Sequence, residues 1–303
     1  MAKPSIVGVD WGSTNLRAFR FDAEGEIAEV RRAESGARTL RGAAFADVLE
    51  TLISDWIDDQ SRIVTCGMAG GREGWTEAPY ANCPVDMHAL AGSVIRAPAK
   101  FADVWIVPGA KSIRDDGRVE VMRGEETQIL GGLENERAPA IVIAPGTHSK
   151  WARVENGRLV SFRTYMTGEL FALLKAHSIL GRTMDVSAPH DAAAFDLGVH
   201  RALEDKGLLN LIFSTRSEVL FEHLSPAAAP SYLSGVLLGA EVGEALDRTP
   251  FTRDTPIFLV GDPGLAGRYA QALAIAGHNQ VQTLDGERAA ARGLWRIALE
   301  RGA

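Results

Sequence analysis

The sequence of 303 residues has few cysteines, no excess of basic charge and no long apolar run. Two cysteines, Cys66 and Cys83, are too few for a disulfide framework or a zinc site. The formal net charge of −7 argues against nucleic acid or an anionic membrane as a partner. No apolar run approaches the roughly 20 residues of a membrane span, and the first residues do not resemble a signal peptide. We therefore expect a reduced, cytoplasmic protein.

Several common catalytic motifs are also missing. Residues 108–112 end in Lys-Ser but lack both glycines of a Walker A motif. The patterns Gly-x-Ser-x-Gly, His-Glu-x-x-His and Cys-x-x-Cys do not occur. The chemistry must therefore be read from less familiar patterns.

The composition is that of a globular protein large enough for two domains. The chain has a mass of 32.5 kDa, with 46% hydrophobic and 23% charged residues. Apolar runs typical of strands alternate with helical patterns, for example over residues 43–57, 192–205 and 232–246. We expect an α/β fold with one domain over residues 1–116 and a second over 117–303.

The first informative segment is a polar turn between two strand-like runs. An apolar run at residues 6–9 leads to Asp10, and Gly12, Ser13, Thr14 and Asn15 follow before a second run at residues 17–21. With a third run at residues 26–30, this pattern predicts a three-stranded antiparallel meander. Backbone N–H groups of such a turn suit phosphate oxygens, and an Asp beside it suits Mg²⁺. An ordinary hairpin turn is the alternative.

A similar arrangement occurs at the start of the second half. The strand-like residues 140–144 lead into a turn with Gly146, Thr147, His148, Ser149 and Lys150. Runs at residues 151–154 and 159–163 flank Asn-Gly, a strong hairpin signal. The turn offers N–H, hydroxyl and ammonium donors for the β- or γ-phosphate of ATP. Two strand–turn–hairpin units in one chain are hard to explain by chance.

A third glycine turn follows the strand-like residues 257–260. Gly261, Asp262 and Gly264 precede a helical pattern, and helix N-termini attract anions. We favour an adenosine site. The alternative is a degenerate dinucleotide fingerprint, although its Gly-x-x-Gly-x-x-Gly spacing differs from the usual one. An ordinary βα turn is the third interpretation.

Candidates for a general base and for substrate binding occur in two other segments. Glu125 and Glu126 stand at a predicted helix start near Gly124, where the helix dipole keeps a carboxylate ionised. Phosphoryl transfer needs one carboxylate to accept the proton of the attacking hydroxyl; the alternative is that both merely favour the first helical turn. In the irregular residues 72–84, Arg72 suits a carboxylate, Glu77 and Tyr80 suit hydroxyls, and Trp75 suits a sugar face. Simple packing of these aromatic side chains is the alternative.

Several strings spread along the chain resemble the 2-dehydro-3-deoxygalactonokinase family of the sugar kinase, Hsp70 and actin superfamily. They are VDWGSTNLR at residues 9–17, GMAG at 67–70, GW at 74–75, EAPY at 77–80, VMRGEETQ at 121–128, PGTHSKW at 145–151, MTGELF at 166–171 and YLSG at 232–235. The strings at 121–128 and 145–151 are specific, whereas the first turn is shared by the whole superfamily.

The resemblance implies two ribonuclease-H-like domains with an interdomain ATP cleft. It implies phosphorylation of the C6 hydroxyl of 2-dehydro-3-deoxy-D-galactonate in galactonate breakdown. Asp10 would hold Mg²⁺, and the nucleotide would contact the two phosphate turns, Arg17 and the Gly261 turn. Glu125, or its neighbour Glu126, would be the base, because the superfamily usually places an Asp there.

The resemblance further suggests that Arg72 or Arg123 binds the substrate carboxylate. A homodimer is one expectation for the assembly. The alternatives are a kinase of the same fold for another sugar acid and, less favoured, a non-catalytic nucleotide or sugar-acid sensor.

Overall fold

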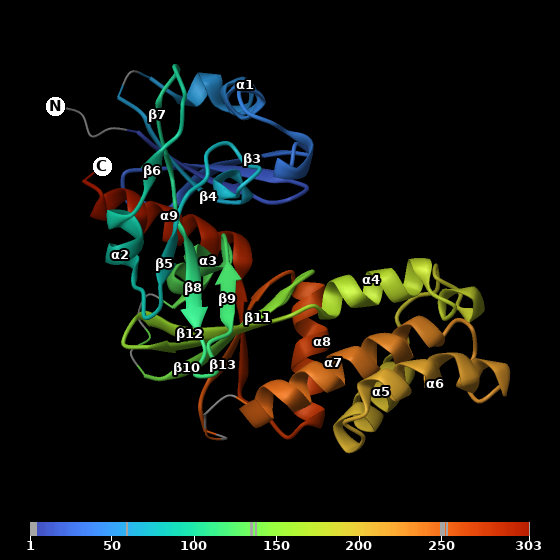
Figure 1. Ribbon diagram of the computed structural model, residues 1–303. Coiled ribbons are helices and arrows are strands. Elements are labelled where there is room, and N and C mark those ends of the chain that lie inside the picture. Colours follow the sequence, from blue (N-terminus) through green and yellow to red (C-terminus); the bar gives the residue numbers. More distant parts are fainter. Residues whose placement is uncertain are drawn as a thin grey trace. The chain divides into compact units, whose positions relative to one another are not determined.

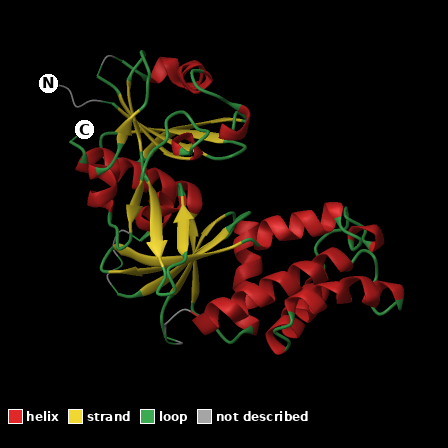
Figure 2. Ribbon diagram, viewed as in Figure 1, coloured by secondary structure: helices red, strands yellow, loops and turns green. Residues whose placement is uncertain are grey.

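The computed structural model describes residues 5–58, 60–133, 136, 138–248, 252 and 254–302. Helices and strands alternate along much of this part of the chain, which confirms the α/β prediction (Figure 1, Figure 2). Two compact units are present. Unit 1 holds the described residues up to 142 together with 152–163 and those from 284 onward, and unit 2 holds 143–151 and the described residues of 164–283. The domain boundary expected near residue 117 stays a prediction.

Unit 1 contains a six-stranded sheet with the order β3-β2-β1-β4-β7-β6. The first three strands form the predicted antiparallel meander, and β4 and β7 continue it in parallel to β1. The strands are β1 (Ile6–Trp11), β2 (Leu16–Phe21), β3 (Ile27–Ala33), β4 (Arg62–Gly67), β6 (Ile95–Arg96) and β7 (Asp103–Ile106).

Both faces of this sheet are covered, which explains why β1 is buried throughout. On one face Val7, Val9 and Trp11 pack in the same apolar cluster as Phe45 and Leu49 of α1 (Ala44–Ile53). On the other face Gly8 lies against Leu294 of α9 (Gly286–Glu300). Asp10 is on this second face, because successive side chains of a strand alternate.

A smaller sheet and two helices complete unit 1. The sheet has the order β5-β8-β9 and consists of β5 (Tyr80–Asn82), β8 (Gly109–Ile113) and β9 (Val119–Met122). The helices are α2 (Met87–Gly92) and α3 (Glu125–Gly132), and both pack against α9. Helix α3 begins one residue after Gly124, as the sequence predicted.

A five-stranded sheet has the order β12-β11-β10-β13-β14. Its strands are β10 (Ala140–Ala144), β11 (Ser149–Glu155), β12 (Arg158–Tyr165), β13 (Ile257–Gly261) and β14 (Val281–Asp285). Asn156 and Gly157 connect β11 and β12 with φ of 51° and 71°, the backbone of a type I′ turn. The predicted hairpin is therefore confirmed, and the strand–turn–hairpin unit occurs twice.

The remaining helices belong to unit 2 (Figure 1). They are α4 (Thr167–His177), α5 (Ala192–Glu204), α6 (Leu208–Leu220), α7 (Ala229–Arg248) and α8 (Pro263–Ile275). Helix α7 packs along α5 and also contacts α4, α6 and α8, so it is the central helix of this unit. The sequence patterns did not predict α6. Of the described helices, none is long and apolar enough to cross a membrane.

Candidate functional site

The first predicted phosphate turn connects β1 and β2. The amide of Gly12 donates to the carbonyl of Asn15 at 2.8 Å, which closes the turn. Its carbonyls at Gly12 and Ser13 accept from the amides of Ala37 and Arg38 at 3.0 and 3.1 Å. Thr14 and Asn15 are exposed, and Gly12 and Ser13 are half-buried. With two carbonyls engaged by another segment, the open side of the turn offers mainly donors, which suits an anion.

Asp10, the last acidic residue before this turn, is buried and paired. It lies directly opposite Arg17 on β2, and the Arg17 Nη2 donates to the Asp10 Oδ2 at 2.5 Å. Only 7% of Asp10 is exposed, and its Oδ1 accepts a weak bond from the Cys66 thiol, with Sγ at 3.8 Å. Burial, and next to it the charge of Asp10, raises the pKa of that thiol, so Cys66 is an inert neighbour.

The donor set around Asp10 does not build a metal site of its own. Within the described ranges, no three His, Cys, Asp or Glu side chains are grouped so that they could hold a metal ion. A single carboxylate fits Mg²⁺ that is bound chiefly by nucleotide phosphates and water, which is the usual arrangement for Mg²⁺ with ATP. Asp10 therefore suits an ion that arrives with the nucleotide.

The two candidate bases at the start of α3 lie in different environments. Glu126 is fully buried and accepts from the Gly124 amide at 2.7 Å and from the Thr127 hydroxyl at 3.0 Å. Burial, and secondly the charge of Glu125, raises the pKa of Glu126 to about 8. Glu125 is half-buried, and its Oε2 accepts from the Arg123 amide at 3.1 Å. The accessible carboxylate is thus Glu125.

Arg123 approaches the segment expected to bind substrate. Its guanidinium lies over the ring of Tyr80 at 4.3 Å and donates through Nη2 to the Ala78 carbonyl at 2.8 Å. Its Nε and Nη1 are buried and have no hydrogen-bond partner among the described residues. A guanidinium with two unsatisfied nitrogens is costly to bury, and a carboxylate placed end-on would accept from Nη1 together with the second N–H of Nη2.

The other residues of this segment separate into open and packed ones. Arg72 and Glu77 are exposed, and Tyr80 is 40% exposed. Trp75 is only 6% exposed, because its ring packs edge-on against Trp11 and stacks on Phe45. This burial contradicts the prediction that Trp75 presents a face to a sugar; the packing alternative describes it.

The second predicted phosphate turn lies between β10 and β11, against the start of α4. The Glu169 amide donates to the Thr147 carbonyl at 2.9 Å. A Cβ on Gly168 would lie 2.4 Å from the Gly146 carbonyl oxygen, so only glycine permits this approach. His148 Nε2 is hydrogen bonded to the Glu169 carboxylate, with both side chains partly exposed. The strings at residues 145–151 and 166–171 are therefore brought together.

Two predicted donors of this turn point into the protein. Ser149 is fully buried, and its hydroxyl donates to Glu241 at 2.7 Å. Lys150 is 4% exposed, and its ammonium donates to the His148 carbonyl at 2.7 Å. The structure thus contradicts a phosphate contact by the Ser149 hydroxyl and gives Lys150 a partner in the backbone of the turn itself.

Glu241 of α7, which the sequence analysis missed, collects several donors inside unit 2. It is 3% exposed and accepts from Ser149, from the Trp151 indole at 2.8 Å and from the Tyr269 hydroxyl at 2.9 Å on each oxygen. Thr167 also bonds it. Burial raises the pKa of Glu241, while these donors oppose that shift. A Glu within an otherwise apolar helical stretch was the only sequence signal.

The third glycine turn ends β13 and begins α8. Gly261 has a φ of 148°, and Asp262 caps the helix by accepting from the Leu265 amide at 2.9 Å. Gly264 is exposed in the first turn of the helix. This arrangement confirms the predicted strand–turn–helix, and the adenosine contact stays a prediction.

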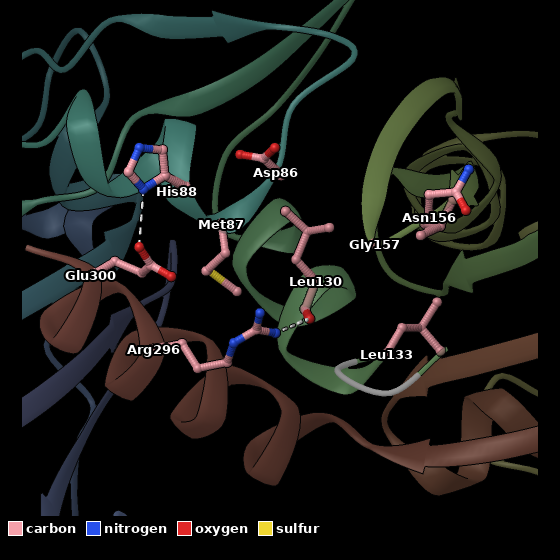
Figure 3. Close-up of a pocket in the computed structure, with 10 residues that line it drawn as sticks. Asp86, Met87, His88, Leu130, Leu133, Asn156, Gly157, Arg296 and Glu300 are labelled. Carbon is pink, nitrogen blue, oxygen red and sulfur yellow. Dashed lines mark hydrogen bonds and ion pairs between the residues drawn. The ribbon is translucent and has the colours of Figure 1, made fainter. Parts of the chain in front are cut away.

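A separate cavity of about 180 Å³ in unit 1 contains none of these residues. His88 is hydrogen bonded to Glu300 at 3.0 Å, and Arg296 donates to the carbonyl of Leu130 (Figure 3). Glu300 raises the pKa of His88. The side chains that line the cavity carry charges of both signs, so they do not favour one class of ligand.

The repeated strand–turn–hairpin and the α3 carboxylates define an α/β protein of the sugar kinase and actin-like ATPase fold. The ADPNP-bound activator of 2-hydroxyisocaproyl-CoA dehydratase from Clostridium difficile shares this fold. That structure superposes with a TM-score of 0.52 at 15% identity, covering 98% of this chain and 96% of its own. The predicted fold class is therefore confirmed.

The family model of 2-keto-3-deoxy-galactonokinase matches residues 10–297, and the chain belongs to this family. The curated 2-dehydro-3-deoxygalactonokinase of Escherichia coli (strain K12) is 35% identical over 294 residues, covering 96% of this chain and 97% of that protein. A Sinorhizobium meliloti crystal structure, described as that of a 2-dehydro-3-deoxygalactonokinase, is also 35% identical. It superposes with a TM-score of 0.89 over 97% of this chain and 98% of its own.

Proposed function

We propose that this protein is a kinase that transfers the γ-phosphoryl group of ATP to the C6 hydroxyl of 2-dehydro-3-deoxy-D-galactonate. Family membership and the names of the E. coli and S. meliloti relatives support this substrate. The observation that carries the proposal is Arg123, a guanidinium with two unpartnered nitrogens two residues before the accessible Glu125. One short segment thus offers a receptor for a carboxylate and a base for a hydroxyl.

In this proposal Glu125 accepts the C6 proton as the hydroxyl attacks the γ-phosphorus in line with the leaving ADP oxygen. Glu126 stays inside the protein and supports the helix start. Arg123 binds the substrate carboxylate, and Glu77 and Tyr80 bind substrate hydroxyls. Arg72 is the second candidate for the carboxylate.

The nucleotide is assigned to three turns. Gly12 closes the first turn through its own amide, and the amides of Ser13, Thr14 and Asn15 and those of Gly146, Thr147 and His148 bind phosphate oxygens. Arg17 and Lys150 add positive charge, and Gly261, Asp262 and Gly264 contact adenosine. Asp10 would hold Mg²⁺ directly or through water, and the ion bound with ATP would neutralise phosphate charge. Use of ATP on a catabolic sugar acid also favours the cytoplasm.

The first test is release of ADP from Mg-ATP in a coupled assay, with the galactonate substrate and its gluconate epimer in parallel. Turnover on the galactonate form with little on the epimer supports the proposal. Turnover on a different sugar acid identifies a kinase of the same fold with another substrate. ATP binding without any turnover identifies a sensor.

The role of Arg123 is tested with Arg123→Lys, which keeps the charge but loses the planar fork of donors. We expect the KM for the sugar acid to rise about 10-fold to 100-fold, as for the loss of a charge-assisted bidentate bond, with the KM for ATP unchanged. Arg72→Lys is the matched control, since Arg72 is exposed. A large rise in the control alone would assign the carboxylate to Arg72.

A further inference from the structure

Glu241 is a buried carboxylate that accepts hydrogen bonds from several side chains. Its partners come from β11, α4 and α8: Ser149, Trp151, Thr167 and Tyr269. The Trp151 indole can only donate, and a carboxylate can only accept. The site is therefore matched to a carboxylate, which offers two charged acceptor oxygens, whereas an amide offers one neutral oxygen.

Three of the donors that meet at Glu241 belong to the two segments that shape the second phosphate turn. Ser149 and Trp151 follow the turn directly on β11, and Thr167 begins α4. The same start of α4 touches the turn, through the Glu169 amide on the Thr147 carbonyl and through the close approach of Gly168 to Gly146. A displacement at Glu241 is thus transmitted to the turn by short covalent paths on both sides.

We propose that Glu241 is a positioning residue for nucleotide binding. Its carboxylate fixes β11 and the start of α4 together, so that the N–H groups of Gly146 and Thr147 keep the spacing that phosphate oxygens require. This inference rests on the proposed role of the turn in binding ATP. Glu241 itself is 3% exposed and touches no phosphate in this scheme.

The test compares Glu241→Gln with wild type by calorimetric titration of Mg-ADP and by steady-state kinetics. We expect the Kd for Mg-ADP and the KM for ATP to rise about 10-fold, because the amide replaces two charged acceptor oxygens by one neutral oxygen and weakens the bonds that join β11 to α4, while the KM for the sugar acid stays the same. Glu241→Asp, which retains the carboxylate, should recover part of the affinity. Glu244→Gln is the matched control, because Glu244 lies on the same helix, is 53% exposed and pairs with Arg248 one turn further along it.

A purely structural role would give another pattern. Glu241→Gln would then lower Tm and kcat, through a smaller folded fraction, and leave both KM values and the Kd unchanged; this result overturns the proposal. If Glu241→Gln does not fold, Tyr269→Phe decides, since Tyr269 bonds Glu241 from α8. A rise of about 3-fold in the Kd for Mg-ADP supports positioning, and an unchanged Kd refutes it.

The proposed function and this inference can fail separately. A wild-type protein that binds Mg-ADP but phosphorylates no sugar acid would refute the function. The Kd of Glu241→Gln for Mg-ADP would still test the positioning role of Glu241. A wild-type protein that turns over the sugar acid, with a Kd insensitive to Glu241→Gln, would refute the inference alone.

Discussion

Two buried glutamates, one in each unit, differ in where the donors around them come from. Glu126 accepts from the Gly124 amide, the Thr127 hydroxyl and its own amide, all within its own helix start. Glu241 accepts from side chains of β11, α4 and α8. Burial raises the pKa of both carboxyl groups, and the donors around each oppose that shift. The same residue type therefore stabilises a single helix start in one unit and joins β11, α4 and α8 to α7 in the other.

We expect the largest effect in the pH dependence of the free energy of unfolding when Glu126→Gln is compared with wild type. The pKa of Glu126 is raised from 4.5 to about 8 in the folded protein. Its contribution to stability is therefore present below pH 4.5 and is lost as the pH rises through 8, by a total on the order of 5 kcal/mol. The amide variant does not titrate at this position. Its free energy of unfolding, relative to that of wild type, should therefore increase between pH 5 and pH 9. Denaturant unfolding at both pH values measures the gain, and parallel curves would contradict it.

A second comparison separates Glu126 from its neighbour Glu125. Glu125→Gln removes the proposed base and should lower kcat about 100-fold to 10,000-fold, the usual contribution of general base catalysis. The KM values should change little, because proton transfer occurs after binding. Glu126→Gln is the matched control, one residue away and buried, and should retain most of the turnover. Equal losses in both variants would show that the helix start, and not a base, had been damaged.

Much of the local structure could be predicted from sequence, because the signals are local. Asn156 and Gly157 predict their hairpin through the φ values that each residue tolerates, and Gly124 predicts the start of α3. The two turns after β1 and β10 were predicted because glycine and short polar residues interrupt apolar runs.

What the sequence did not reveal depends on tertiary contacts. Trp75 and Ser149 look like ligand-binding residues in their loops, but the first packs on Phe45 and the second bonds Glu241. The partners of Glu241 are distant in sequence: Ser149 and Tyr269 are separated from it by 92 and 28 residues. No local pattern links such residues, so their role becomes visible only when the sheet and helices are assembled.

The smallest expected effect concerns one donor to Glu126, the hydroxyl of Thr127. Thr127→Val keeps the shape of this fully buried side chain and removes its hydrogen bond to the Glu126 Oε1. The cost at pH 6 should be about 1 kcal/mol, the net worth of one hydrogen bond. It should grow above pH 8, because the hydroxyl supports the ionised form and lowers the pKa of Glu126. Removing it raises that pKa further, so the variant continues to lose stability at pH values where wild type has finished titrating. Unfolding of both proteins at pH 6 and pH 9 isolates the contribution of this hydrogen bond, since all other titratable groups are the same in the two proteins. A cost that shrinks at pH 9 would mean that Thr127 supports the protonated acid, and the charge of Glu126 would then be stabilised by the Gly124 amide and its own amide.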